Sequence, residues 1–242
     1  MQTDNVAPQP SPQSSRTPVL FCWSGGKDSA LALHELLMDP AVDLRGLLTT
    51  VTDGYDRVSM HGVRTSLVAA QAAALEMPLW SVRIPPSATN EQYERAMGET
   101  LTAIRREGIE AIAFGDLFLA DVRAYRERLV AATGLRPVFP LWGKGTADLA
   151  RRFVSCGFRA VVVCVDPRQI DVSHCGVDYD RALLEALPGS ADPCGERGEF
   201  HTFVYDGPMF RQPIAVQRGV VVERDGFLFC DLLPGGAEGA SS

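Results

Sequence analysis

The sequence predicts an α/β protein in which a parallel, doubly wound sheet is followed by a smaller α+β domain. Two observations carry this prediction: short apolar strands alternate with helical patterns over most of the chain, and the alternation ends near residue 166. Strands that alternate with helices form parallel sheets with both faces covered. The 242 residues, 46% of them hydrophobic, are enough for the cores of one large or two small domains.

The alternating part follows a tail at residues 1–17 that is rich in Pro, Gln and Ser. This tail has too few apolar side chains to offset the entropy of ordering, so we expect it to be disordered. Apolar runs predict strands, and runs with helical spacing predict helices. The expected strands are 19–23, 44–51, 79–84, 110–114 and 160–165. The expected helices are 30–37, 66–76, 91–107, 120–133 and 146–155.

The last third is expected to hold one short helix at 179–187 and three extended runs near the C-terminus. Two of these runs flank Asp225 and Gly226, a pair that accepts positive φ and is typical of a two-residue hairpin. We therefore divide the chain into a sheet domain at 18–143, a C-terminal domain at 144–234, and disordered tails at 1–17 and 235–242.

Composition excludes several classes of protein. No apolar run approaches the roughly 18 residues that a membrane span needs, and no leader-like segment precedes the first strand, so we expect a cytoplasmic protein. The six cysteines include no Cys-x-x-Cys pair, which argues against a disulfide framework and a zinc finger. A net charge of -7 is unfavourable for nucleic acid, so small molecules or a protein are the expected partners.

A glycine-rich hexapeptide, SGGKDS, lies between the first predicted strand and the first predicted helix. Backbone N–H groups and the helix dipole favour an anion there, and glycines let the backbone approach phosphate closely. Lys27 adds a compact charge, and it is one of only two lysines among 23 basic residues. The spacing is not that of a Walker motif. An ordinary glycine turn is the alternative. The predicted phosphate-binding residues are Ser24, Gly25, Gly26, Lys27, Asp28 and Ser29.

A second cluster, CGERGEFHT at residues 194–202, gathers a thiol, two carboxylates and an imidazole. A strand from residue 200 would place Glu199 and His201 on one face, with Phe200 and Thr202 on the other. A carboxylate beside an imidazole can orient it, accept a proton from ammonium or hold a cation. The alternative is a solvated turn with a structural histidine. Metal binding through His174, Cys175, Cys194 and His201 is a further alternative, but their spacing fits no familiar ligand pattern, so no metal site is predicted.

Both clusters resemble motifs of a known enzyme family. SGGKDS after a strand resembles the PP-loop of N-type ATP pyrophosphatases, which split ATP into AMP and pyrophosphate. CGERGEFHT, continuing into VYDGPMF, is similar to the C-terminal motif of the diphthine–ammonia ligase family, a branch of the PP-loop enzymes. The remaining family landmarks occur in the expected order: SMH at 59–61, GDL at 115–117, RAYRERL at 123–129 and PLWGKGTADL from 140.

The resemblance implies a domain of the adenine nucleotide alpha hydrolase (HUP) type that binds ATP and Mg²⁺, and a C-terminal domain that binds the substrate. In the family a carboxylate is adenylated with release of pyrophosphate, and ammonia then displaces AMP to form an amide. The implied acceptor carboxylate lies on a protein like elongation factor 2, or on a small molecule. The implied site residues are His61, Gly115 and Asp116 for the nucleotide, and Lys27, Glu196, Glu199 and His201 for catalysis.

Other functions stay open. A bacterial PP-loop relative would adenylate a different acceptor. A tRNA-modifying PP-loop ATPase is less favoured because thiolating members typically need paired cysteines and because this chain is acidic. A non-catalytic nucleotide-binding module would leave the second cluster without a role. Phe200 stands where the family more often has tyrosine, so a phenol is absent at this position. The protein could also assemble as a homo-oligomer, and the sequence does not decide this.

Overall fold

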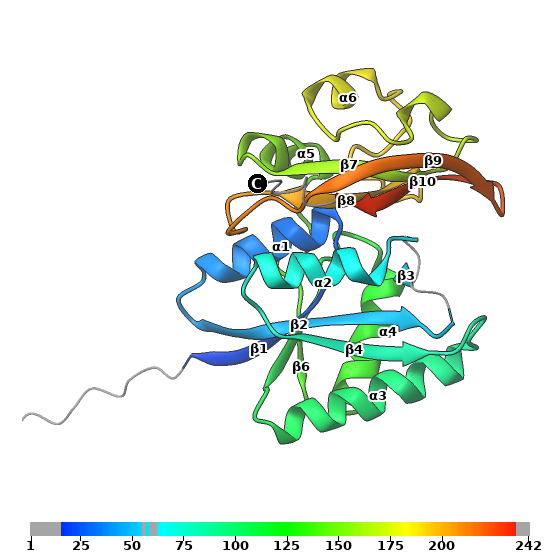
Figure 1. Cartoon of the computed structure of the whole chain (residues 1–242). Helices are drawn as coiled ribbons and strands as arrows, with labels where there is room; N and C mark the ends of the chain where they lie inside the picture. The colour runs from blue at the N-terminus through cyan, green and yellow to red at the C-terminus, as the bar shows by residue number, and fades with distance from the viewer. Residues whose placement is uncertain (1–15, 55–56, 59–61, 236–242) are drawn as a thin grey trace, which may run out of the picture.

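The computed structural model describes residues 16–54, 57–58 and 62–235. Two sheets are stacked, with helices between them and on both outer sides (Figure 1). This arrangement confirms the predicted α/β fold with a separate, smaller C-terminal sheet. Within the described ranges, no helix combines the length and the apolar character needed to cross a membrane.

The first sheet is formed by the N-terminal part of the chain. Its strands are β1 (Thr17–Cys22), β2 (Val42–Thr52), β3 (Arg57–Val58), β4 (Leu79–Ile84), β5 (Ala111–Ala113) and β6 (Arg136–Val138). Their order is β3-β2-β1-β5-β6, with β4 also paired to β2, and every pair except β2–β3 is parallel. The chain builds outward from β1 first to one side and later to the other. The loop after β1 therefore lies where the strand order reverses, which is the usual ligand position in such sheets.

Helices cover both faces of the first sheet, as the doubly wound fold requires. They are α1 (Lys27–Met38), α2 (Thr65–Ala74), α3 (Asn90–Arg106) and α4 (Ala120–Ala131). Side chains of β1 alternate between two cores: Phe21 packs on the side of α1 and α2, and Leu20 on the side of α3 and α4. Figure 1 shows α1 and α2 between the two sheets.

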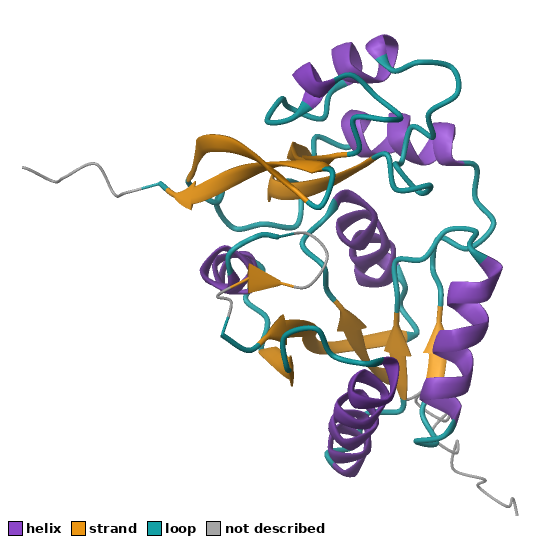
Figure 2. Cartoon of the chain, turned by 90° about the vertical axis from the view of Figure 1, so that its right-hand side faces the viewer, coloured by secondary structure: helices purple, strands orange, loops and turns teal. Residues whose placement is uncertain are grey.

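The second sheet is antiparallel and has the order β8-β7-β10-β9. Its strands are β7 (Arg159–Val165), β8 (Phe200–Asp206), β9 (Val216–Arg224) and β10 (Phe227–Pro234). The predicted hairpin joins β9 to β10, with φ of 52° at Asp225 and 80° at Gly226. The side of this sheet that faces away from the first sheet carries α5 (Thr146–Ser155) and α6 (Arg181–Ala186), as Figures 1 and 2 show. The short helix η1 (Val172–His174) lies between them in the chain.

One hydrophobic cluster connects the two sheets through α1 and α2. It includes Phe21 and Leu33 from the N-terminal part and Phe153, Val163 and Phe203 from the C-terminal part, all nearly fully buried. Burying one such side chain contributes roughly 1.5–3 kcal/mol. The two sheets therefore stabilise each other, and the loops at their junction are held in fixed relative positions.

Several local features differ from the sequence-based expectation, including β3 and η1, and three of them have a clear physical reason. Strand β6 was not predicted because it is short and contains Pro137, which is tolerated there because β6 is an edge strand. Helix α6 is shorter than expected because Asp180 caps it, accepting the Leu183 N–H at 3.0 Å, and Tyr179 enters the core. Helix α1 starts at Lys27, three residues earlier than expected, so the end of SGGKDS forms its first turn.

Candidate active site

The SGGKDS segment, here called the PP-loop (residues 24–29), joins β1 to α1. Gly26 is the N-cap of α1, and Gly25 has a φ of 80°, the left-handed region that glycine adopts without strain. The hydroxyl oxygens of Ser24 and Ser29 lie 2.7 Å apart, and the Gly26 N–H donates to Ser24 Oγ at 3.3 Å. The loop is thus closed by its own hydroxyl groups at the N-terminus of a helix, where an anion is favoured.

The PP-loop is also bonded directly to β8 of the second sheet. The Val204 N–H donates to the Gly25 carbonyl at 2.9 Å, and the Lys27 N–H donates to Thr202 Oγ1 at 3.0 Å. These bonds join positions about 180 residues apart in the sequence. The predicted phosphate loop and the predicted acceptor strand therefore meet.

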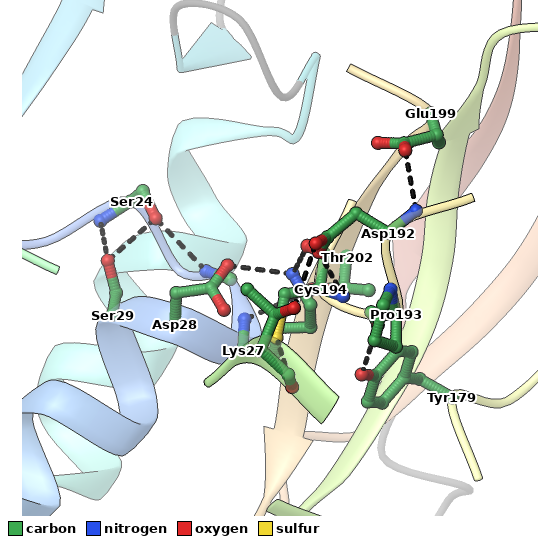
Figure 3. Close-up of polar contacts among 12 residues, drawn as sticks. Ser24, Lys27, Asp28, Ser29, Tyr179, Asp192, Pro193, Cys194, Glu199 and Thr202 are labelled. Carbon is green, nitrogen blue, oxygen red and sulfur yellow. Dashed lines mark hydrogen bonds and ion pairs between the residues drawn. The ribbon is translucent and has the colours of Figure 1, made fainter. Parts of the chain in front are cut away.

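Lys27 occupies the centre of this junction (Figure 3). Its side chain is buried, and its Nζ donates to Asp28 Oδ2 at 2.7 Å and to the carbonyl oxygen of Cys194. The rings of Tyr179 and Phe200 lie 5.8 and 5.3 Å from Nζ, within cation–π distance. Burial favours the neutral amine, but the Asp28 carboxylate outweighs it and the pKa of Lys27 is raised. The site therefore contains an ammonium charge at neutral pH.

The segment that faces Lys27, here called the acceptor loop (residues 192–199), is shaped by two buried carboxylates. Asp192 accepts the Cys194 N–H at 2.7 Å and the Thr146 hydroxyl at 2.8 Å. Glu199 accepts the Asp192 N–H at 2.7 Å and the Arg197 N–H at 2.9 Å. Charged acceptors make strong bonds to N–H groups, so both carboxylates fix the path of the loop.

Glycine and tyrosine complete the shape of the acceptor loop. Gly195 has a φ of 68°, and a Cβ there would lie 2.6 Å from the carbonyl oxygen of Phe200. The Tyr179 hydroxyl donates to the Pro193 carbonyl at 2.6 Å (Figure 3). The Cys194 carbonyl is therefore presented to Lys27 by contacts on both sides of it.

The predicted catalytic residues have different environments. Glu199 is 1% exposed and uses both oxygens on backbone N–H groups, so the structure gives it a positioning role, while direct catalysis by it stays a prediction. Burial and the nearby Asp28 carboxylate raise the pKa of Glu196 to about 7. Burial and the Lys27 charge lower the pKa of His201 to about 4, so its imidazole is neutral at neutral pH.

The GDL landmark lies against the PP-loop. A Cβ on Gly115 would lie 3.1 Å from the backbone nitrogen of Ser29, so glycine allows a close approach of this segment to the first turn of α1. Asp116 accepts from Arg126 Nε at 3.0 Å, and this guanidinium stacks on Phe114 at 4.7 Å. The RAYRERL landmark, which contains Arg126, is thereby joined to GDL. His61 lies outside the described residues.

The remaining candidate positions have other partners. Lys144, the second lysine beside glycine, donates from Nζ to Glu35 Oε2 at 2.8 Å, and Arg152 contacts the same carboxylate. Lys144 therefore joins α1 to the segment before α5. All six cysteines are free thiols. In the part of the chain that the structure describes, no three His, Cys, Asp or Glu side chains form a group able to hold a metal ion.

Several residues that shape the site are not evident from the sequence. Asp192 and Tyr179 act through backbone carbonyls and N–H groups, which no spacing rule reveals. Gln71 of α2 is fully buried, although glutamine is normally exposed. Its position three and four residues after Val68 and Leu67 placed it on the apolar face of the helix, and that was the available signal.

Comparisons with known proteins cover both parts of this site. The family model for the diphthamide synthase N-terminal domain matches residues 16–137, and that for the diphthamide synthase C-terminal domain matches 145–230. Diphthine–ammonia ligase of Homo sapiens is 26% identical over 221 residues, and that of Bos taurus is 26% identical over 223, each covering 82% of both chains. The Schizosaccharomyces pombe protein of that name is 25% identical over 88% of this chain and 38% of its own length. The chain belongs to the diphthamide synthase family.

Proposed function

We propose that this protein is an ATP-dependent ligase that adenylates a carboxylate, releases pyrophosphate, and transfers ammonia to form an amide and AMP. One observation carries the proposal: the buried ammonium of Lys27, a residue of the PP-loop, contacts the Cys194 carbonyl of the acceptor loop. A phosphate group held by the first loop and a carboxylate held by the second would therefore be adjacent. The relatives are named diphthine–ammonia ligases, so diphthine is the proposed acceptor.

The two steps follow from the chemistry of the groups. A carboxylate is not attacked by ammonia because its leaving group would be oxide. Attack of the carboxylate oxygen on the α-phosphorus forms a mixed anhydride and expels pyrophosphate, and ammonia then attacks the acyl carbon and expels AMP. Lys27 and the N–H groups at the start of α1 stabilise the charge that develops on the departing pyrophosphate.

Glu196 is proposed as the base that makes ammonia nucleophilic. Ammonium must lose a proton before attack, and a catalytic base works best when its pKa lies near the operating pH. The pKa of Glu196 is raised to about 7 by burial and by the Asp28 carboxylate. His201, neutral because burial and Lys27 lower its pKa to about 4, can accept a hydrogen bond or donate one without adding charge.

Magnesium fits the charge balance of the site. The carboxylates of Asp28, Asp192 and Asp116 all raise the pKa of Glu196, and the Lys27 ammonium lowers it. An incoming triphosphate needs additional positive charge, and carboxylate oxygens together with phosphates are ligands that Mg²⁺ prefers. We propose that Asp28 holds the ion, which would supply charge neutralisation at the phosphates.

In this proposal the two parts of the chain bind different substrates. Residues 18–143 would bind ATP, with Gly115, Asp116 and His61 lining the nucleotide pocket. Residues 144–234 would bind the acceptor through the acceptor loop and β8. The division falls between β6 and α5, next to the ion pair of Lys144 with Glu35.

Product analysis tests the proposal. Purified protein is incubated with Mg²⁺, ATP labelled at the α-phosphate, isotope-labelled ammonium, and elongation factor 2 that carries diphthine. We expect labelled AMP, pyrophosphate, and acceptor that contains the nitrogen label in equal amounts. Formation of ADP and orthophosphate would overturn the chemistry. Formation of AMP with a different carboxylate, but not with diphthine, would overturn the proposed acceptor.

A further inference from the structure

We infer that Gln71 is a positioning residue that holds the PP-loop in register with β8 and thereby couples adenylation to amide formation. The coupling rests on the proposed function. Gln71 lies on α2, remote in sequence from both loops, and its side chain is fully buried. Its Oε1 accepts the Trp23 indole N–H at 2.8 Å, and its Nε2 donates to the carbonyls of Gly25 at 3.0 Å and Val204 at 2.6 Å.

The three partners require a primary amide at this position. An indole N–H can only donate, and a carbonyl oxygen can only accept, so the side chain between them must provide one acceptor and two donors. Glutamate provides no donor when ionised, methionine provides neither group with useful strength, and asparagine is shorter by one methylene. Every polar atom of the Gln71 side chain is therefore used, and its orientation is fixed by its partners.

The partners also explain what Gln71 controls. Trp23 immediately precedes the PP-loop, Gly25 lies within it, and Val204 lies on β8. The Gly25 carbonyl receives both the Gln71 amide and the Val204 N–H, the latter at 2.9 Å. A Cβ on Gly25 would lie 2.7 Å from Gln71 Oε1, so the loop backbone packs directly on the amide. Gln71 thus sets the direction of the peptide group that leads into the N-terminus of α1.

The register of β8 then determines where Lys27 meets the acceptor loop. Thr202, two residues before Val204 on the same strand, accepts the Lys27 N–H at 3.0 Å. A shift between the PP-loop and β8 would therefore move the Lys27 ammonium relative to the Cys194 carbonyl. Small displacements of reacting groups reduce rates strongly. With the acceptor loop misplaced, water attacks the adenylate instead of ammonia, which returns the carboxylate and AMP without an amide.

The first test measures the ratio of amide to AMP in Gln71→Met, which keeps the side-chain length and removes all three bonds. Gln217→Met, on the exposed surface of β9, is the matched control. Assays are run well below the unfolding temperature of each variant. We expect one amide per AMP in the parent and the control, and a ratio lowered by about tenfold or more in Gln71→Met. A ratio unchanged while both products fall together would show a merely structural role and overturn the inference.

The second test needs no turnover and so separates this inference from the proposed function. Hydrogen exchange is measured without substrates in the same variants. We expect faster exchange in Gln71→Met at residues 24–29 and 202–206, by about tenfold or more, with α3 unchanged. Acceleration throughout the chain, or in neither segment, would overturn the inference. If the parent instead released ADP, only the proposed function would fail, because the exchange pattern tests Gln71 by itself.

Discussion

The PP-loop is shaped by hydroxyl and backbone groups, whereas the acceptor loop that faces it is shaped by buried carboxylates. In the first, Ser24 and Ser29 bond to each other 2.7 Å apart, and Lys27 contributes the charge. In the second, Asp192 and Glu199 each accept two groups from the surrounding chain. The difference shows that the PP-loop depends on the single charge of Lys27, so it can be disabled by deleting that charge. The acceptor loop depends on carboxylate oxygens that bind its own N–H groups and the Thr146 hydroxyl, so it can be disabled by replacing single atoms.

The largest expected effect follows from removing the charge at the junction. Lys27→Ala should lower AMP formation at saturating ATP by two to three decades, or roughly 3 kcal/mol, comparable to the loss of one oxyanion donor. Lys144→Ala is the control because that ammonium forms a partly exposed ion pair with Glu35, worth about 1 kcal/mol or less. It should stay near the parental rate. A Lys27→Ala rate close to that of the parent would remove the PP-loop from the mechanism.

The next effect concerns the acceptor side and its pH dependence. The kcat/KM of the parent should rise with pH through about 7, because burial and Asp28 raise the pKa of Glu196 to about 7 and the base must be ionised. The rate of Glu196→Gln should be about 100-fold lower than that of the parent, and its pH profile should lack this rising limb. His201→Asn should keep it, because burial and Lys27 hold the pKa of His201 near 4. Persistence of the limb in Glu196→Gln would assign the base elsewhere.

A smaller effect is expected from a single-atom change at Glu199. In Glu199→Gln one acceptor oxygen becomes an NH₂ group that faces a backbone N–H, which should lower the free energy of unfolding by about 1–3 kcal/mol. ATP affinity, measured by calorimetry, should not change, while amide formation falls. Glu223→Gln, exposed on β9, is the control. Weakened ATP binding with a parental amide-to-AMP ratio would place Glu199 in the nucleotide half.

The smallest net effect is that of pH on the stability of the parent, because two pKa shifts of opposite sign offset each other. The folded pKa of Glu196, about 7 because of burial and Asp28, lies above its ordinary 4.5, so its contribution to stability decreases as pH rises between these values. The folded pKa of His201, about 4 because of burial and Lys27, lies below its ordinary 6.5, so stability increases as pH rises from 4 to 6.5. In denaturant unfolding at a series of pH values, Glu196→Gln should lack the decrease in stability with rising pH, and His201→Asn should lack the increase.

The contrast between the loops also explains what the sequence could predict. The strand–loop–helix order of SGGKDS depends on neighbours in the chain, so both its position after β1 and its place at the helix N-terminus were predictable. The alternation that predicted the parallel sheet is likewise local. Strand β6 was not predicted because Pro137 is unfavourable in strands except at a sheet edge. Whether a strand lies at the edge depends on the tertiary structure and cannot be read from the local sequence.

The roles within the acceptor loop could be predicted only in part. The density of charged residues in CGERGEFHT indicated a site, and residue types alone cannot distinguish a carboxylate that binds backbone N–H groups from one that reacts. Glu199 is of the first kind in this structure, whereas Glu196 has a raised pKa. The spacing of Gln71 indicated burial, but its role could not be predicted, because its three partners come from the residue after β1, the PP-loop and β8.

A double-mutant cycle on kcat/KM for amide formation tests most directly whether the two loops form one centre. Lys27→Ala and Glu196→Gln are measured separately and together. When two residues act in one centre, the loss of kcat/KM in the double variant is smaller than the product of the two single losses. We therefore predict a loss that is smaller than this product by at least about fivefold, or roughly 1 kcal/mol of coupling. Losses that multiply to within about twofold, or roughly 0.4 kcal/mol, would contradict a shared centre and leave two independent sites.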